Sequence, residues 1–392
     1  MKRLRSLLLV ALWLSVGLAF AGPPLHASAG SDPKGSPAVS GWPSSMASTG
    51  DSITRAYNTG SFPFSDAPAN SWSTGTNATV NSHYSRILAA FPGISGHNFN
   101  DAVTGAKMTD LNGQIATVNT QHVDYVTILL GANDACTPTE ADMIPVATYR
   151  AQFQAALNTL AAGSPDARVY VLSVPNIYNL WSILHDNSSA RSTWGLLSIC
   201  QSMLANPQST AQADVDRRNR VLQRVVDYNT QLAQVCAANV HCRFDNNVVF
   251  NTAFVPSDVT TRDYFHPTVA GQAKLSTATY AAGFDFTDSI PPTSWATLSA
   301  PFPPLPAVPQ AVMVALSASD NVGVSGIEYK LDGGPYTRYD RGIPLNPGST
   351  LTYRAVDVNG NVEASHTLQP QPPAQLGKAA TARQSSLHVL AL

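Results

Sequence analysis

Short apolar runs alternate with amphipathic segments from residue 44 to about residue 285. Three of the apolar runs predict buried strands, at residues 46–49, 124–130 and 168–174. Strands that alternate with helices favour a mostly parallel sheet with helices on both of its faces. We therefore expect an α/β domain over residues 44–287.

Two segments have the apolar spacing of amphipathic helices. The first lies between the second and third predicted strands and ends at Gly163-Ser164-Pro165. Its apolar face is expected to consist of Tyr149, Phe153, Leu157 and Leu160. The second covers residues 208–239, and its apolar face is expected to consist of Val215, Leu222, Val226 and Leu232.

The pattern changes at residue 288, where a Pro-rich linker at 290–293 precedes a series of short β-rich runs. These runs lie at residues 311–317, 326–331 and 350–356. The dipeptides Asp332-Gly333 and Asn359-Gly360 are typical of β-hairpins. They predict a small all-β domain over residues 288–368, and the Pro-rich residues 369–392 predict a disordered tail.

The N-terminus has the pattern of a secretory signal peptide. Basic residues precede an apolar run at 7–20, which is shorter than the ~20 residues of a membrane-spanning helix. Ala19-Phe20-Ala21 is a small-x-small cleavage site, so residues 1–21 are expected to be removed. An uncleaved membrane anchor is the alternative. Residues 22–43, rich in Gly, Pro, Ser and Ala, are expected to form a disordered linker.

The composition limits the class of partner. Charged residues make up 12% of the chain, about half the usual ~25%, and the formal net charge is −2. A protein that binds nucleic acid non-specifically needs a basic face, so the sequence argues against that class. A surface that relies on uncharged polar residues is common in secreted proteins.

The chain has four cysteines, which allow three disulfide pairings. Proximity in the sequence favours Cys136 with Cys200 and Cys236 with Cys242. A zinc site is the alternative, but there is no Cys-x-x-Cys motif, and an oxidising compartment favours disulfides. We expect two disulfides, no metal and no cofactor.

The chemistry-bearing motifs come in a fixed order along the chain. Gly50-Asp51-Ser52 follows the first predicted strand, where open α/β sheets bind ligands, although a helix cap is the simpler explanation of this tripeptide alone. Gly105 follows, and Asn133 stands directly after the second predicted strand. Asp263 and His266 share one Asp-x-x-His-Pro segment, a spacing that lets a carboxylate orient an imidazole.

With these motifs in this order, the sequence resembles the SGNH, or GDSL, hydrolase family from residue 46 to about residue 285. The resemblance implies a three-layer αβα sandwich that cleaves esters without a metal. It implies that Ser52 is the nucleophile, His266 the general base and Asp263 its orienting partner. It also implies an oxyanion hole formed by Ser52, Gly105 and Asn133. Tyr264-Phe265 replaces the small residue of many relatives and is expected to shape the mouth of the pocket.

Two narrower resemblances add to this interpretation. Residues 71–75 and 131–136 resemble phospholipase-B-like members, although Trp72 could equally belong to the core. The predicted β domain resembles bacterial immunoglobulin-like repeats, which implies a spacer or a unit that attaches the protein to a cell surface or polymer. Asp320 and Asp357 of that domain are expected to be turn residues rather than calcium ligands.

We therefore expect a secreted, monomeric serine hydrolase of carboxylic esters, an esterase or lipase with phospholipids among its candidate substrates, working through an acyl-enzyme on Ser52. The first alternative is a carbohydrate O-acetyl esterase, which would use the same acyl-enzyme chemistry on a different substrate. A non-catalytic surface-binding protein on the same fold is the alternative of another class. The complete set of site residues argues against it, because a dead relative would tolerate the loss of any one of them.

Overall fold

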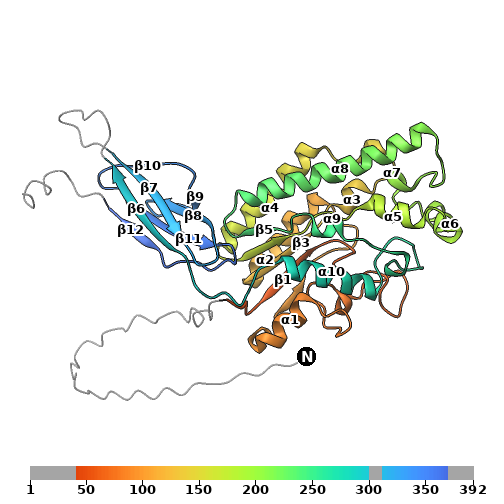
Figure 1. Cartoon of the computed structure of the whole chain (residues 1–392), viewed down its shortest axis with the longest axis horizontal. Coiled ribbons are helices and arrows are strands. Elements are labelled where there is room, and N and C mark those ends of the chain that lie inside the picture. Colours follow the sequence, from red (N-terminus) through yellow and green to blue (C-terminus); the bar gives the residue numbers. More distant parts are fainter. Residues whose placement is uncertain (1–40, 300–310, 370–392) are drawn as a thin grey trace, which may run out of the picture. The chain divides into compact units, whose positions relative to one another are not determined.

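The computed structural model describes residues 41–299 and 311–369 (Figure 1). The predicted signal peptide, most of the predicted linker at 22–43 and all but the first residue of the predicted C-terminal tail lie outside the described residues. At the start of the described chain, the ring of Trp42 lies 5.8 Å from that of Phe286. No helix in residues 41–299 or 311–369 is both long enough and apolar enough to span a bilayer.

A five-stranded, fully parallel sheet forms the centre of the first part, in the order β2-β1-β3-β4-β5. Its strands are β1 (Met46–Gly50), β2 (Asn98–Asn100), β3 (Tyr125–Leu129), β4 (Arg168–Val171) and β5 (Cys242–Phe244). The three predicted strands correspond to β1, β3 and β4, which confirms the parallel α/β prediction. The strands β2 and β5 are only three residues long, too short to stand out as apolar runs.

Helices connect the strands and cover the sheet. The α-helices are α1 (His83–Ala90), α2 (Leu111–Gln121), α3 (Ala132–Ala135), α4 (Val146–Gly163), α5 (Ile177–Leu184), α6 (Ser188–Leu196), α7 (Gln201–Leu204), α8 (Gln212–Ala237), α9 (Val248–Asn251) and α10 (Val269–Ala282). The short 3-10 helices are η1 (Pro68–Asn70), η2 (Pro92–Ile94), η3 (Met108–Asp110), η4 (Glu140–Asp142) and η5 (Pro256–Asp258).

The sheet separates two apolar cores, because successive side chains of a strand point to opposite faces. On β3, Val126 and Ile128 pack with residues of α2, α4 and α8, whereas Tyr125 and Leu129 pack with residues of α1 and α10. Figure 1 shows α4 and α8 on one side of the sheet and α1 and α10 on the other. The three-layer αβα arrangement is therefore confirmed.

The helix α4 buries the face that its sequence predicts, but the predicted face of α8 is wrong. Of the four residues expected there, only Leu232 is buried, and Val226 is 37% exposed. The buried stripe runs instead through Val221, Val225, Tyr228, Leu232 and Val235. Contact with α4 selects this face, since the ring of Tyr228 stacks 4.1 Å from that of Tyr149.

The C-terminal part forms two antiparallel sheets, in the orders β10-β7-β6 and β12-β11-β8-β9. Its strands are β6 (Thr293–Ser299), β7 (Val312–Ser319), β8 (Val324–Leu331), β9 (Thr337–Arg338), β10 (Ile343–Leu345), β11 (Leu351–Asp357) and β12 (His366–Leu368). The three predicted β-rich runs correspond to β7, β8 and β11. The strand β6, which begins at the end of the predicted linker, was not foreseen because exposed side chains dominate its pattern.

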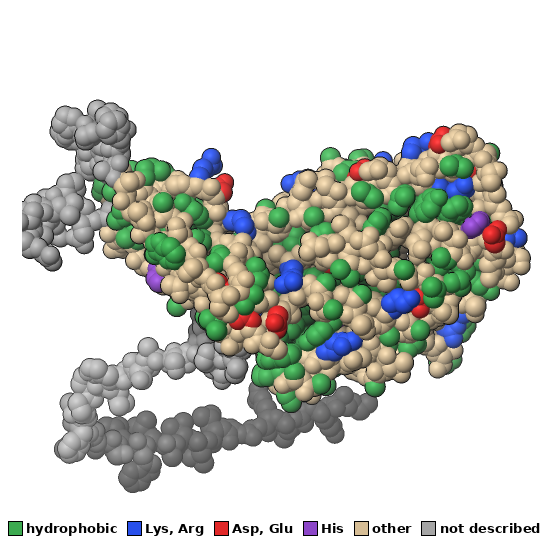
Figure 2. All heavy atoms as spheres, in the orientation of Figure 1, with side chains coloured by type: hydrophobic (Ala, Val, Ile, Leu, Met, Phe, Trp, Pro, Cys, Tyr) green, Lys and Arg blue, Asp and Glu red, His purple; other side chains and the backbone are tan. Residues whose placement is uncertain are grey.

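The described cysteines form the two favoured disulfides, Cys136–Cys200 and Cys236–Cys242. The second joins the end of α8 to the start of β5. Figure 2 shows charged side chains as separate spots on a surface of apolar and uncharged polar atoms, in keeping with a charged content of 12%.

Gly50 fixes how closely the ends of β1 and β3 approach each other. Its φ is +144°, and a Cβ atom there would lie 2.3 Å from the carbonyl oxygen of Leu129. The side-chain amide of Gln114 holds the same residue, because it accepts from the N–H of Gly50 at 2.8 Å and donates to its carbonyl at 2.9 Å. Only glycine tolerates both this φ and this close approach to Leu129. The end of β1 therefore has a backbone direction that no other residue would adopt without strain.

The variant Gly50→Ala should therefore lose about 2 kcal/mol or more of the free energy of unfolding, from left-handed strain and the backbone clash. Gly113→Ala is the matched control, because it lies in α2 with open space around its Cβ position and should gain ~0.5–1 kcal/mol. Urea unfolding of both variants measures the difference. Equal stabilities would contradict this account of Gly50.

Candidate active site

The loops that follow the parallel strands β1 and β3 lie at the same edge of the sheet. Gly50 at the end of β1 pairs in register with Leu129 at the end of β3, so the Asp51-Ser52 turn and α3 begin side by side. Gly131 makes the second turn, with a φ of +132°. A Cβ atom there would lie 2.6 Å from the hydroxyl of Tyr149.

Ser52, His266 and Asp263 form a continuous series of hydrogen-bond contacts, although 214 residues separate the first two in the chain. The Nε2 atom of His266 lies 2.8 Å from Ser52 Oγ, and its Nδ1 atom lies 2.8 Å from Asp263 Oδ2. Ser52 is 6% exposed and Asp263 is 3% exposed. The structure thus brings together the three residues that the sequence singled out.

The carboxyl group of Asp263 is held in its charged form. Burial alone would raise its pKa, but the hydrogen bond and charge of His266 and the backbone N–H groups of Phe265 and His266 outweigh burial and lower the pKa below 3.8. A charged Asp263 favours a proton on Nδ1 of the imidazole. Nε2 is then free to accept the proton of the Ser52 hydroxyl.

Asn58 is a further contact of this carboxylate that the sequence analysis did not identify. Its side-chain amide nitrogen donates to Asp263 Oδ2, and its side-chain oxygen accepts from the backbone N–H of Phe64. Its backbone carbonyl accepts from Arg262 at 3.0 Å. Asn58 is buried and has a φ of +65°, a conformation that asparagine tolerates better than most residues. No motif marks it, because its place depends on the shape of the surrounding loop.

The expected oxyanion donors lie at the same edge of the sheet. The amide of Asn133 donates to the carbonyl of Ala106 at 3.0 Å, which ties α3 to the loop that carries Gly105. The N–H of Val103 in this loop donates to the carbonyl of Gly50 at 3.1 Å. An asparagine amide has two hydrogens, so Asn133 retains one for a ligand. Gly105 is exposed, with a φ of +84° and open space around it.

Two buried carboxyl groups flank these loops. Burial raises the pKa of Asp51 to about 6 and the pKa of Asp134 to about 7. Asp134 Oδ2 accepts from the N–H of Met108 at 2.9 Å, whereas its Oδ1 is buried with no partner among the described residues. The sequence analysis assigned neither residue a role in the site.

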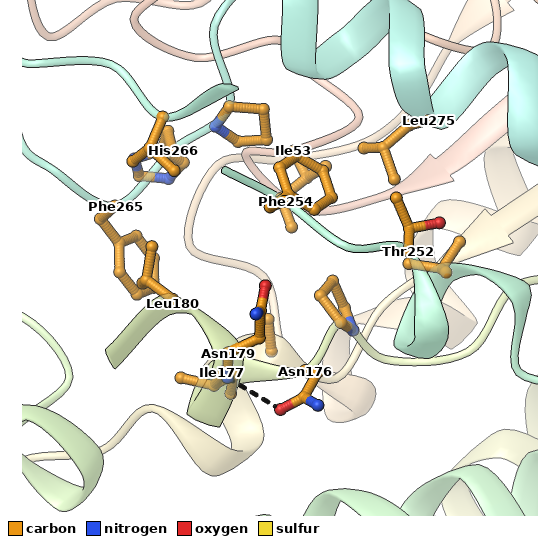
Figure 3. A pocket seen from close by; sticks show the side chains of 15 residues that line it. Ile53, Asn176, Ile177, Asn179, Leu180, Thr252, Phe254, Phe265, His266 and Leu275 are labelled. Atoms are coloured by element: carbon orange, nitrogen blue, oxygen red, sulfur yellow. Dashed lines mark hydrogen bonds between the residues drawn. The ribbon is translucent and has the colours of Figure 1, made fainter. Parts of the chain in front are cut away.

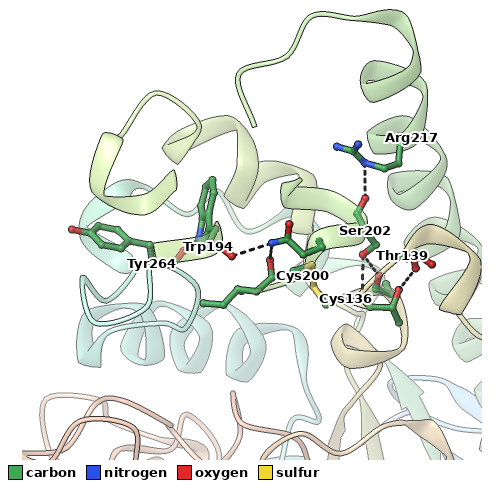
Figure 4. The surroundings of a disulfide bond; sticks show 11 residues. Cys136, Thr139, Trp194, Cys200, Ser202, Arg217 and Tyr264 are labelled. Carbon is green, nitrogen blue, oxygen red and sulfur yellow. Dashed lines mark hydrogen bonds between the residues drawn. A yellow bond between two sulfur atoms is a disulfide. The ribbon is translucent and has the colours of Figure 1, made fainter. Parts of the chain in front are cut away.

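The disulfide and α6 support the site from outside (Figure 4). The Cys136–Cys200 bridge anchors the end of α3, and the hydroxyl of Ser202 donates to the carbonyl of Ala135 at 2.7 Å. The indole N–H of Trp194 donates to the carbonyl of Tyr264 at 2.9 Å, within the segment that carries Asp263 and His266. Both connections restrain the backbone next to site residues.

An apolar cavity opens beside His266 (Figure 3). Phe265 lines it, as the sequence analysis expected for this segment, and so do Ile53 and Ala132, the chain neighbours of Ser52 and Asn133. Trp72 does not line this cavity. It is fully buried, its indole N–H lies 3.4 Å from the hydroxyl of Thr54, and it belongs to the core between the sheet and α1.

Among residues 41–299 and 311–369, two groups of acidic and histidine side chains lie close enough together to share a cation: Asp166, His241 and Glu328; Asp288, Asp320 and Asp357. Neither group includes a residue of the Ser52 site. In the first, Arg354 already forms ion pairs with Glu328 and Asp166. In the second, Asp320 and Asp357 accept hydrogen bonds from turn N–H groups, the role that the sequence predicts for them.

Comparisons with known proteins identify a family for the larger part of the chain. The model of the GDSL-like Lipase/Acylhydrolase family matches residues 49–274. No curated protein matches the chain.

Several solved structures are similar to the chain. Phospholipase A1 from Streptomyces albidoflavus is 18% identical with a TM-score of 0.36, over 61% of this chain and 98% of that one. LAE5, an alpha/beta hydrolase enzyme from the metagenome of Lake Arreo, Spain, is 17% identical with a TM-score of 0.37, over 61% and 94%. A two-domain esterase active on acetylated mannans is 14% identical with a TM-score of 0.31, over 82% and 85%. These similarities carry no statement about the substrate of this chain.

The raised pKa of Asp134 predicts a pH-dependent stability. The carboxyl group of Asp134 binds its proton more tightly in the folded state than in the unfolded state. The protonated carboxyl group therefore contributes fully to the free energy of unfolding below about pH 4, and this contribution is lost as the pH rises through about 7. Asn cannot ionise. The stability of Asp134→Asn relative to the unmodified protein should therefore rise by roughly 2–3 kcal/mol from pH 5 to pH 8.

Urea unfolding at the two pH values measures this change. Asp340→Asn, at a side chain that is 74% exposed, is the control and should show no comparable trend. A stability difference between Asp134→Asn and the unmodified protein that is the same at both pH values would contradict the prediction.

Proposed function

The chain belongs to the GDSL-like lipase/acylhydrolase family, and from that premise we propose that it is a secreted serine hydrolase that cleaves carboxylic esters through an acyl-enzyme on Ser52. The single observation that carries the proposal is the series of contacts from Ser52 Oγ through His266 to the buried carboxylate of Asp263. This is the geometry of a nucleophile, a general base and the group that orients the base.

In the first half of the proposed reaction, Ser52 Oγ attacks the ester carbonyl while His266 Nε2 takes its proton. The negative charge of Asp263 stabilises the resulting imidazolium. The carbonyl oxygen becomes an oxyanion that accepts hydrogen bonds from the backbone N–H groups of Ser52 and Gly105 and from the amide of Asn133. The tetrahedral intermediate collapses, the C–O bond to the alcohol breaks, and His266 returns the proton to the leaving oxygen.

In the second half, water replaces the alcohol. His266 takes a proton from the water, whose oxygen attacks the acyl carbon, and the same donors hold the second oxyanion. The bond between the acyl carbon and Ser52 Oγ then breaks, and the proton passes from His266 to Oγ. The products are a carboxylic acid and free enzyme, and the protein's own residues carry every proton transfer.

Secretion and attachment are part of the proposal. Two disulfides and the N-terminal signal pattern support export into an oxidising compartment. We propose that the C-terminal β domain, over residues 288–368, is immunoglobulin-like and holds the enzyme at a cell surface or polymer. The presence of every expected site residue favours this enzyme over a non-catalytic surface-binding protein.

The variant Ser52→Ala should lower kcat/KM for p-nitrophenyl butyrate by at least ~10³-fold, because it removes the nucleophile. Ser61→Ala, at an exposed serine, is the matched control and should keep full activity. Circular dichroism and thermal unfolding check that both variants fold. Activity of Ser52→Ala within tenfold of the unmodified enzyme would remove Ser52 from the mechanism.

We propose that Asn58 is a positioning residue that acts through Asp263. Asn58→Asp keeps the size of the side chain but replaces the donor with a negative charge, which favours the imidazolium form of His266. We expect kcat to fall ~10-fold, KM to change less than about threefold, and the half-maximal pH of activity to rise. Asn158→Asp, at an exposed position on α4, is the control. An unchanged kcat together with an unchanged pH profile in folded Asn58→Asp would refute the proposal.

A further inference from the structure

Gly105, the proposed oxyanion donor, lies on an exposed turn that side-chain packing does not hold. Val103, Thr104 and Gly105 are all exposed. Apart from the chain neighbours of Gly105, no heavy atom lies within 4 Å of the position that a Cβ atom of this residue would take. Its φ is +84°, a region that glycine enters without steric cost. The direction of its N–H group therefore depends on hydrogen bonds to the turn.

Two hydrogen bonds hold the ends of this turn. The N–H of Val103 donates to the carbonyl of Gly50 at 3.1 Å, and the carbonyl of Ala106 accepts from the amide of Asn133 at 3.0 Å. Within residues 41–299 and 311–369, the N–H of Gly105 donates to no backbone carbonyl. The two bonds flank the peptide unit that carries this N–H, and neither is made by that unit.

The side chain of Thr104 provides a third connection, directly beside the peptide unit in question. Its hydroxyl donates to Asp66 Oδ1 at 2.5 Å, a length typical of a hydrogen bond from a hydroxyl to a carboxylate. The Cα atom of Thr104 begins the peptide unit whose N–H belongs to Gly105. Because the side chain of Thr104 is held, rotation of this unit is restricted.

Asp66 is in turn connected to the segment that carries Ser52. Its Oδ2 atom accepts from Arg55 Nε at 2.9 Å, and the side chains of Arg55 and Asp66 are only 25% and 30% exposed. The N–H of Arg55 donates to the carbonyl of Asp51 at 3.1 Å, and its guanidinium donates to the carbonyl of Asn100 at 3.2 Å. One carboxylate thus links the turn of the proposed nucleophile to the turn of the proposed oxyanion donor.

We propose that Asp66 is a positioning residue, which acts through Thr104 to hold the N–H of Gly105 toward the oxyanion of an ester that reacts with Ser52. This inference rests on the proposed function. Both halves of that reaction pass through an oxyanion, so a misdirected N–H would slow both and lower kcat more than it changes KM. Complete removal of one oxyanion donor costs ~10²–10³-fold in kcat, so a loosened donor should cost less.

The variant Thr104→Val removes the hydroxyl that Asp66 accepts and keeps the shape of the side chain. We expect kcat for p-nitrophenyl acetate to fall ~10-fold and KM to change less than about threefold. Thr104→Ser keeps a hydroxyl and should restore kcat to within about threefold of the unmodified enzyme. The matched control is Thr109→Val, at an exposed threonine on η3, and it should keep full activity. An unchanged kcat in folded Thr104→Val would overturn the proposal.

A double variant tests whether the two side chains act through one contact. Asp66→Ala should lower kcat at least as much as Thr104→Val does. The double variant Asp66→Ala/Thr104→Val should be no more than about threefold slower than Asp66→Ala, because both changes break the same hydrogen bond. Asp340→Ala, at a side chain that is 74% exposed, is the control for loss of a carboxylate. Single effects that multiply in full in the double variant would overturn the proposal.

Hydrogen exchange keeps this inference separate from the proposed function. Mass spectrometry follows a peptide over residues 101–108, which contains the hydrogen-bonded N–H groups of Val103 and Ala106. These groups should exchange at least about threefold faster in Thr104→Val, whereas Thr109→Val should leave their exchange unchanged. Unchanged exchange in Thr104→Val would overturn the proposal at any level of activity, and with esters still hydrolysed the proposed function would stand. If the unmodified protein hydrolyses no ester but exchange accelerates in Thr104→Val, the proposed function fails and the link from Asp66 to the turn stands.

Discussion

The close approach of β1 to β3 at Gly50 is the constraint on which the site depends. Because Gly50 has no side chain, the strand end passes against the carbonyl of Leu129, and the amide of Gln114 fixes its direction. Parallel pairing then places the turn with Ser52 beside the turn with Asn133. The Cys136–Cys200 disulfide restrains the turn that carries Asn133. Each of the two turns is therefore held by its own strand and neighbouring elements, and not only by contact with the other turn.

A buried charge joins the distant segments of the site. Asp263 is expensive to bury as a carboxylate, and four donors offset this cost: Nδ1 of His266, two backbone N–H groups and the amide of Asn58. The side-chain oxygen of Asn58 also accepts a hydrogen bond from the backbone N–H of Phe64, which closes the loop between these two residues. The triad geometry and the loop at its rim are therefore parts of one hydrogen-bonded unit. The raised pKa values of Asp51 and Asp134 show that further carboxyl groups beside the site are held at a cost in stability.

The fold and the central residues of the site follow from local sequence signals, whereas their surroundings do not. Ser52 and His266 stand in short motifs at strand ends or in tight loops, where local spacing decides what they can contact. Asn58 and the wall of the cavity depend on loops that meet only in the folded chain. The buried face of α8 was predicted wrongly for a similar reason, since its register is set by the stacking of Tyr228 on Tyr149.

The central claim is that Ser52 is a nucleophile activated by His266. An alkyl fluorophosphonate forms a P–O bond with an activated serine and releases fluoride, so the labelled residue identifies the nucleophile. Peptide mass spectrometry measures the site of attachment. The account predicts one adduct, on Ser52, and its loss in His266→Ala. An adduct on another serine, or undiminished labelling of Ser52 in His266→Ala, would contradict it.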